Sequence, residues 1–312
     1  MPAPDPPICD YEGSDYQVSF WDQGGREYED RVEAIALKRL LPKGGGLLLE
    51  LGAGAGRNTP RYAGFQRIVL LDYSLSQLEQ AQRALGRSER YIYVAADIYR
   101  LPFVDGLFDA ATMIRVLHHM ADAPRALRQV RDVLKPDGAF ILEFANKRNV
   151  KSILRYWLGR QEWNPFTSEP VEFAKLNFDF HPGRVQAWLE ALGFRVVRKL
   201  TVSHFRSPAL KKLVPVWFLV FLDSLLQPTG RMWQYSPSVF FGLRGGNAIS
   251  HTVDLGADLL SMFKCPVCGQ APLAEAGDRL ICGNCGMQWG AANGIYDFRR
   301  PVAPPAGASR PG

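Results

Sequence analysis

The chain has 312 residues, of which 47% are hydrophobic and 22% charged, and this composition and length fit a globular protein with one large domain and a small one. The formal net charge of +6 permits anionic partners without demonstrating one. The N-terminus lacks the features of a signal peptide, and the longest apolar run, residues 213–222, contains Pro215 and is shorter than the roughly 20 residues of a membrane span. We therefore expect a cytoplasmic protein without a transmembrane segment.

A glycine-rich turn follows the first strongly apolar stretch of the chain. Glu50 ends this stretch, and Gly52, Gly54 and Gly56 come directly after it. Open α/β sheets hold nucleotide-like ligands at such strand-to-helix turns, because glycine lets the backbone approach the ligand closely. Arg57 stands where a dinucleotide fingerprint requires a small residue, and the lysine of a P-loop is absent. The alternative is a tight turn that binds no ligand.

Two further carboxylates end predicted strands. Asp72 follows an apolar segment, 16 residues after Gly56, and could accept hydrogen bonds from both hydroxyls of a ribose. The alternative is that Asp72 caps the next helix. Asp97, which precedes Ile98, ends the third predicted strand, and its alternative role is that of a turn residue.

The order of these segments is more specific than any one of them. A strand that begins at Phe108-Asp109, a helix, the turn 136–138 and a fifth strand follow in turn. The whole resembles class I S-adenosylmethionine (SAM)-dependent methyltransferases of the small-molecule, type 11-like branch. This resemblance covers residues of about 30 to 246 and implies an α/β, Rossmann-like, seven-stranded, mostly parallel sheet with one antiparallel strand in its last hairpin.

The resemblance also implies a set of SAM-binding residues. In that family the first acidic residue, here Glu50, helps to hold the cationic end of SAM, and Arg115 would lie near its methionine part. Asp97 would meet the adenine amino group while Ile98 covers the ring. The full implied set is Glu50, Gly52, Gly54, Gly56, Asp72, Asp97, Ile98 and Arg115. Residues 1–29 would form a tail and flap over the cofactor, with Tyr11, Tyr16, Trp21 and Tyr28 as the aromatic candidates.

Four of the five cysteines lie in one C-terminal segment. Cys265, Cys268, Cys282 and Cys285 form a C-x2-C-x13-C-x2-C pattern, which is typical of a structural zinc site with four thiolate ligands. We expect a linker over 247–261, a zinc ribbon over 262–300 and a disordered tail over 301–312, and we expect Cys9 to be an incidental thiol. The segment resembles the zinc-ribbon partners that activate certain RNA and protein methyltransferases.

Two further segments depart from the regular alternation of strands and helices. Residues 146–180 are expected to form a substrate lid that begins with an amphipathic, basic helix at about 150–158. We expect this helix to pack its apolar face on the domain, although a membrane surface or a phosphate backbone remains an alternative. Residues 207–227 predict an apolar helical segment that serves as core and pocket wall, with an interfacial contact as the alternative.

The predicted function is methyl transfer from SAM to a small, lipophilic acceptor of quinone or lipid type. His119 is the candidate general base, ahead of His118 and His181, and a base is needed only if the acceptor loses a proton. An alternative is an RNA or protein methyltransferase that recognises its substrate through the ribbon, although the fourth strand is followed by IRVL and not by an NPPY-like motif. A third is a scaffold that binds no SAM.

Overall fold

The computed structural model describes residues 5–10, 12–13, 25–246, 250–251 and 259–302. Three of the proposed flap residues, Tyr11, Tyr16 and Trp21, lie outside the described residues. The same holds for most of the expected linker 247–261 and for most of the tail 301–312.

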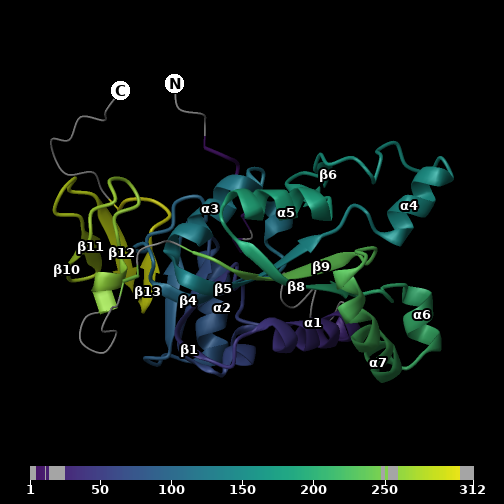
Figure 1. The fold of residues 1–312 in the computed structure, drawn as a ribbon. Helices are drawn as coiled ribbons and strands as arrows, with labels where there is room; N and C mark the ends of the chain where they lie inside the picture. The colour runs from purple at the N-terminus through teal and green to yellow at the C-terminus, as the bar shows by residue number, and fades with distance from the viewer. Residues whose placement is uncertain (1–4, 11, 14–24, 247–249, 252–258, 303–312) are drawn as a thin grey trace.

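The centre of the molecule is one continuous twisted sheet (Figure 1). Seven of its strands run in the order β3-β2-β1-β4-β5-β9-β8, and all pair in parallel except β9, which is antiparallel to both of its neighbours. These seven strands are β1 (Gly45–Leu51), β2 (Phe65–Asp72), β3 (Tyr91–Ala95), β4 (Phe108–Met113), β5 (Leu134–Ala145), β8 (Arg195–Val202) and β9 (Ser238–Arg244). This part of the sheet has the expected number of strands and the expected antiparallel hairpin.

The prediction that the sheet ends at seven strands is wrong, because the cysteine-containing segment continues it to eleven. Its strands are β10 (Ala274–Ala276), β11 (Arg279–Ile281), β12 (Gln288–Ala292) and β13 (Ile295–Asp297). β13 pairs in parallel with β3 through Ile295–Tyr93, Tyr296–Val94 and Asp297–Ala95. An uncovered β3 would be an edge strand with unpaired backbone groups, and the pairing removes that edge.

Side chains also join the ribbon to the sheet. Phe263 is fully buried against Phe103, with ring centroids 5.9 Å apart. The neighbouring Lys264 pairs with Asp105 at 2.6 Å. The ribbon is therefore packed onto the sheet as well as hydrogen-bonded to it.

Helices cover both faces of the sheet. The apolar run of β1 is buried on both sides: Leu47, Leu49 and Leu51 belong to one core cluster and Leu48 to the other. α3 and α5 pack on the first face, and α1, α2 and α7 on the second (Figure 1). The helices are α1 (Glu27–Leu40), α2 (Leu75–Leu85), α3 (Ala123–Val133), α4 (Val150–Trp157), α5 (Pro182–Ala191), α6 (Pro208–Leu213) and α7 (Val216–Leu226), and the short 3-10 helices are η2 (Thr59–Tyr62), η3 (Leu117–His119), η4 (Gln227–Arg231) and η5 (Leu259–Met262).

Side-chain caps fix the starts of the helices that follow strands. Ser74 accepts a hydrogen bond from Gln77 N at the start of α2, and Asp122 accepts one from Arg125 N at the start of α3. Such caps satisfy donors that the first turn of a helix leaves unpaired. Both helices therefore begin directly beside the ends of the central strands, where a ligand can reach the loops.

The region predicted as a lid contains α4 and a two-stranded hairpin, β6 (Val171–Ala174) and β7 (Asn177–Asp179). Lys147 is fully buried beneath it and donates hydrogen bonds to Thr167 Oγ1 at 3.0 Å and to the Glu169 carbonyl at 2.6 Å. The Lys147 ammonium group therefore ties the irregular part of this region to the end of β5.

The expectation that α4 packs its apolar face on the domain is wrong. Of the predicted face, Ile153 is buried, whereas Val150, Leu154, Trp157 and Leu158 are exposed. The inward side of this short helix is instead partly polar, because Ser152 is buried and bonded to the capping Asn149.

The expectation that residues 207–227 form core and pocket wall is also wrong for most of the segment. α7 turns Leu219, Val220 and Asp223 inward, where Asp223 accepts a hydrogen bond of 2.6 Å from Tyr28 of α1. Because this polar contact fixes the inward face, the apolar residues on the other side of the helix face solvent; they include Trp217, Phe221 and Leu225. Among the described residues, no helix is long and apolar enough to cross a bilayer.

Candidate active site

A pocket lies where β1, β2, β3 and β4 end. Its empty space, including the part open to solvent, is about 770 Å³. The lining residues are Ile8, Cys9, Gly52, Gly54, Leu71, Asp72, Tyr73, Gln77, Ala96, Ile98, Arg115, Val116, His119 and Met120. The structure thus brings Gly52, Gly54, Asp72, Ile98, Arg115 and His119 of the predicted set together in one pocket.

The three glycines of the turn have different surroundings. All three have positive φ, between 54° and 80°. A Cβ on Gly52 would overlap Val116, and one on Gly56 would lie 2.8 Å from Leu85 of α2. A Cβ on Gly54 would have only Gln77 within reach, at 3.9 Å. Gly54 therefore borders open pocket space, whereas Gly56 is required by helix packing and does not line the pocket.

Asp72 is held at the tip of β2 with its carboxylate in the pocket. It accepts hydrogen bonds from Gly54 N at 2.8 Å and from Ser74 N at 2.9 Å. Burial raises the pKa of this carboxyl group, and the two backbone donors oppose the shift. The same hydrogen bonds fix both the glycine turn and the orientation of the carboxylate.

Besides Gly56, the two carboxylates Glu50 and Asp97 of the predicted set lie outside the pocket lining. Glu50 is buried and accepts a hydrogen bond of 2.6 Å from Thr59 Oγ1, and burial raises its pKa to about 7. Asp97 accepts a hydrogen bond from Tyr99 N at 2.8 Å, although its neighbours Ala96 and Ile98 line the pocket. Both carboxylates are thus engaged within the protein in this structure.

The N-terminal segment reaches the pocket through Ile8 and Cys9. Asp5 anchors it to α3 through Arg125 at 3.1 Å, and Glu12 accepts a hydrogen bond from Leu75 N at the start of α2. Tyr28, the described member of the proposed aromatic flap, is instead buried between α1 and α7.

Arg115 is fixed in an unusual backbone conformation at the end of β4. Its φ is 60°, a region that non-glycine residues seldom occupy. Its backbone N–H donates to Glu143 at 2.9 Å, and its guanidinium pairs with the fully buried Glu33 of α1. Burial alone would raise the pKa of Glu33, but Arg115 and Arg57 outweigh it and hold that pKa below its usual value.

A second, polar chamber adjoins the first pocket and shares Arg115 and His119 with it. Its lining comprises Arg115, His118, His119, Glu143, Ala145, Asn146, Asn149, Phe173, Asn177, Asp179, Arg206 and Pro237. Burial raises the pKa of Asp179 to about 6 and lowers that of Arg206. Arg206 Nε and His118 Nδ1 are buried and have no hydrogen-bond partner among the described residues.

Sequence reasoning missed most of this chamber. Glu143 was detectable, because it is a lone charge inside the apolar stretch of a buried strand and such a group is costly unless it is used. Asp179 and Arg206 carry no comparable local signal, since only the folded chain brings β7 and the segment before α6 to the end of β5.

His119 lies between the two cavities. Its Nδ1–H donates to the Leu176 carbonyl at 3.0 Å, an assignment that follows because a carbonyl can only accept. The lone pair is then on Nε2, the arrangement a general base requires. Burial lowers the pKa of His119, so the neutral form predominates at neutral pH. His181, by contrast, caps α5 and lines neither cavity.

The four cysteines of the ribbon form a compact group. Their sulfurs all lie within 4.8 Å of one another, and the closest pairs are Cys268–Cys282 at 3.4 Å and Cys265–Cys285 at 3.6 Å. These separations exceed the roughly 2.05 Å of a disulfide and agree with four thiolates around one ion at about 2.3 Å. The donor set is compatible with a closed, structural zinc site.

Comparison with known proteins decides the family. A methyltransferase domain model matches residues 49–142. Demethylmenaquinone methyltransferase of Clavibacter sepedonicus is 32% identical over 188 residues, which cover 56% of this chain and 77% of that protein. The chain belongs to the SAM-dependent methyltransferase family.

Two further comparisons agree with this family. The 27-O-demethylrifamycin SV methyltransferase of Amycolatopsis mediterranei is 30% identical over 139 residues, 42% of this chain and 51% of that protein. The chain thus spans about half the length of that relative. A Listeria monocytogenes structure named a putative S-adenosylmethionine-dependent methyltransferase superposes with a TM-score of 0.52, 18% identity and coverage of 70% of this chain and 99% of that one. At this identity it supports the fold alone.

The first pocket of the methyltransferase fits its family's cofactor. Gly54 leaves open space where a larger residue would intrude, and Asp72 presents a carboxylate beside it. Leu71, Ile98 and Met120 supply apolar walls.

Proposed function

We propose that this methyltransferase transfers a methyl group from SAM to a small, lipophilic acceptor. The observation that carries the proposal is the shared wall: Arg115 and His119 line both the first pocket and the polar chamber. A donor in one cavity and an acceptor in the other would meet at these two residues. Such alignment supplies most of the catalysis that an activated methyl group requires.

In this proposal the first pocket holds SAM. Asp72 accepts hydrogen bonds from the ribose hydroxyls, Ile98 covers the adenine and Arg115 lies beside the methionine part. Gly52 and Gly54 allow close approach, and Gly56 supports the turn from outside the lining. Glu50 and Asp97 support the turn and the third strand end, and they reach SAM only if their present hydrogen bonds rearrange.

SAM supplies a methyl group that its positively charged sulfur already activates. A nucleophilic oxygen or carbon of the acceptor forms the new bond to this carbon as the carbon–sulfur bond breaks, and the bonding electrons remain on sulfur. If the acceptor is a hydroxyl or an acidic carbon, His119 Nε2 takes its proton. Arg115 and His119 would also keep water from the reacting atoms.

The acceptor class rests on the chamber and on relatives. Phe173 of the β6–β7 hairpin lines the chamber beside polar groups that can orient a hydroxyl or carbonyl. Relatives named for quinone-type acceptors include demethylmenaquinone methyltransferases. We therefore favour an aromatic, quinone-like or lipid-like molecule with an ionisable hydroxyl or ring carbon.

We propose further that the cysteine group binds Zn²⁺ and that the ribbon, about residues 262–300, has a structural role. None of the four cysteines lines either described cavity, and the ribbon continues the sheet beyond β3, on the side away from β5 and β9. An RNA or protein substrate recognised through the ribbon remains the alternative.

The test is to incubate the purified protein with methyl-labelled SAM and a lipid extract, or the aqueous and macromolecular fractions, of its source cells. We expect label to appear in the organic phase. Label confined to RNA or protein would favour the alternative. Absence of SAM binding by calorimetry would refute methyl transfer altogether.

A further inference from the structure

One end of the molecule exposes large apolar side chains on several neighbouring elements. Leu213 of α6 is 83% exposed, Met232 after η4 is 74% exposed and Trp157 of α4 is 70% exposed. Trp217, Trp233 and Leu158 are also exposed. We call these six residues the apolar end surface. Scattered exposed apolar residues are normal, but three exposed tryptophans on elements at one end of the molecule (Figure 1) make this end a candidate for a binding surface.

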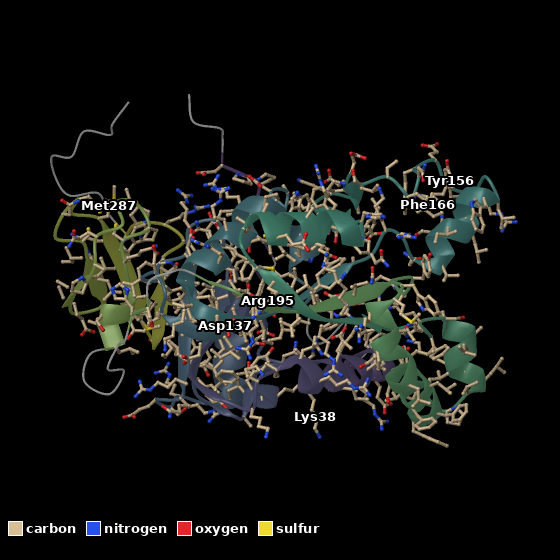
Figure 2. The ribbon with its side chains drawn as sticks, in the orientation of Figure 1. Lys38, Asp137, Tyr156, Phe166, Arg195 and Met287 are labelled. Carbon is tan, nitrogen blue, oxygen red and sulfur yellow. The ribbon has the colours of Figure 1, made fainter. Side chains whose placement is uncertain are left out.

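The elements that carry the apolar end surface are joined to one another. Val150 N donates to the Tyr235 carbonyl at 3.0 Å, and the Arg148 guanidinium donates to the Tyr235 hydroxyl at 3.1 Å. The start of α4 is thereby fixed to the segment that follows η4. Figure 1 shows α4, α6 and α7 at the end of the molecule opposite the ribbon, and Figure 2 shows Tyr156 and Phe166 there too.

The buried polar groups on the inward side of α7 already have hydrogen-bond partners. Its exposed apolar side is therefore not the result of incomplete packing within the chain. Asp223 of α7 receives Tyr28 Oη at 2.6 Å and His204 N at 2.8 Å. Gln227, one turn further, donates to the Val32 carbonyl at 2.9 Å. α7 is thus held against α1 through Asp223, together with Leu219 and Val220, and its remaining apolar residues, including Trp217, face outward.

The charges around the surface are almost all positive. Residues 146–161 contain five basic residues, of which Lys147 is buried, and no acidic one. Residues 203–235 contain four basic residues, of which Arg206 lines the chamber and Lys211 pairs with Glu29 of α1, and a single acidic one, the buried Asp223. The whole chain is far more balanced, with 37 basic and 31 acidic residues. Lys151, Arg155 and Lys212 are among the exposed basic groups that remain.

We propose that the apolar end surface binds the headgroup region of an anionic lipid bilayer. Tryptophan and leucine enter the boundary between headgroups and acyl chains, and lysine and arginine pair with anionic headgroups. A second copy of this chain fits less well, because it would bring the two basic surfaces face to face and like charges oppose such contacts.

The position of the polar chamber connects this surface with the proposed function. Asn149 lines the chamber and caps α4, and Arg206 lines it two residues before α6 begins. Phe173, another lining residue, is 59% exposed. The chamber therefore lies between the elements that would touch the bilayer. This step rests on the proposed function, and it means that a membrane-dissolved acceptor could enter without crossing water.

The test is co-sedimentation of the full chain with vesicles of equal parts phosphatidylcholine and phosphatidylglycerol. Leu158→Ser with Leu213→Ser is the test variant, and Val197→Ser with Val302→Ser, two exposed apolar residues outside the surface, is the matched control. We expect the test variant to bind vesicles at least about tenfold more weakly, because two side chains that would enter the apolar part of the bilayer become polar. The control should bind like the wild type.

A charge-reversal pair tests the electrostatic part. Lys151→Glu with Lys212→Glu should weaken binding by about tenfold or more, whereas Lys38→Glu with Lys43→Glu should not. Lys38 is exposed on α1, far from α4 in Figure 2. Binding by the wild type should also fall with added salt and with pure phosphatidylcholine.

Three results would overturn the proposal: no vesicle binding by the wild type, equal binding by test and control variants, or a dimer in solution that the leucine variant dissolves. Calorimetric titration of the same variants with SAM separates the two proposals. Retained SAM affinity with lost vesicle binding leaves methyl transfer intact, whereas lost SAM binding by the wild type would refute methyl transfer and leave the membrane result standing.

Discussion

Asp72 has a structural role and a proposed binding role that can be separated. Its carboxylate holds the glycine turn, and it is the proposed acceptor for the ribose hydroxyls. In Asp72→Asn the amide oxygen can still accept one of the backbone hydrogen bonds from Gly54 and Ser74. The charge that would receive the ribose hydroxyls is lost. Hydrogen bonds to charged groups contribute about 1.5–3 kcal/mol, so we expect SAM to bind about tenfold to a hundredfold more weakly by calorimetric titration.

The chain offers a matched control for this substitution. Asp109 also accepts two backbone hydrogen bonds, from Gly46 N at 2.9 Å and Leu47 N at 2.8 Å, but at the opposite end of β1. Asp109→Asn should lower stability without changing SAM affinity. Equal loss of affinity in both variants would show that Asp72 acts only through the stability of the turn.

His119 gives the activity its predicted pH dependence. Burial lowers its pKa from the ordinary value of 6.5, and a base works in its unprotonated form. The rate of methyl transfer should therefore stay level above neutral pH and fall as the pH drops through a value below 6.5. His119→Gln should reduce the rate by about a hundredfold or more and remove this acidic limb. The measurement is the initial rate of label transfer to the organic phase across pH.

His181→Gln is the control, because His181 caps α5 outside both cavities. An unchanged pH profile in His119→Gln, or an equal loss in His181→Gln, would remove His119 from the role of base. The acceptor would then be one that loses no proton.

For single residues, the sequence predicts those that come directly after a strand and therefore lie at its end. Gly52, Gly54 and Asp72 were predictable because the apolar strands place them directly at the sheet's ligand-binding edge. Asp179 and Arg206 were not, because their proximity to His119 depends on how distant segments pack. Local pattern therefore locates the donor pocket well and the acceptor chamber poorly.

At the scale of elements, α1 and α7 are held together by a buried polar contact. The Tyr28 hydroxyl donates to Asp223 at 2.6 Å and accepts from Phe205 N at 2.9 Å. Tyr28→Phe leaves the Phe205 N–H without its acceptor, whereas Asp223 loses one donor and keeps those of His204 and Gln227. One unsatisfied group costs about 1–3 kcal/mol, so we expect a loss of unfolding free energy of about 1–3 kcal/mol in urea denaturation.

Tyr156→Phe is the matched control, because Tyr156 projects from α4 at the end of the molecule in Figure 2 and its stability effect should stay within about 0.5 kcal/mol. If both variants lost the same free energy, the contact between α1 and α7 would not be what holds α7 in place.

The same contact explains why the helices were easier to predict than their orientation. Apolar periodicity located α4 and α7, but it assigns the apolar side to the core by default. In α7 a single aspartate, paired with a tyrosine nearly two hundred positions earlier, selects the inward side, which it shares with Leu219 and Val220, and most of the other apolar residues face solvent. A charged residue within a strongly apolar helix is therefore a signal that the inward side contains that residue.

At the scale of the whole molecule, the seven-stranded part follows from the sequence, but its continuation into the ribbon does not. The pattern of four cysteines predicts a small separate unit, and nothing local indicates that β13 pairs with β3. The pairing depends on an edge strand left open elsewhere in the chain. It makes the ribbon part of the same cooperative structure.

This arrangement predicts that metal removal affects the entire fold. Substitution of the buried Cys282 by serine, or treatment with a strong chelator, should release zinc, unfold the ribbon and uncover β3. A loss of about 3 kcal/mol would lower Tm by roughly 6–12 °C for a fold of this size. Calorimetry should show one transition that shifts as a whole, and zinc content is measured by elemental analysis.

Cys9→Ser, which lies outside the ribbon, should retain zinc and Tm. A separate small transition that disappears while the main one stays would instead mean that the ribbon unfolds independently, because a shared sheet would couple the two.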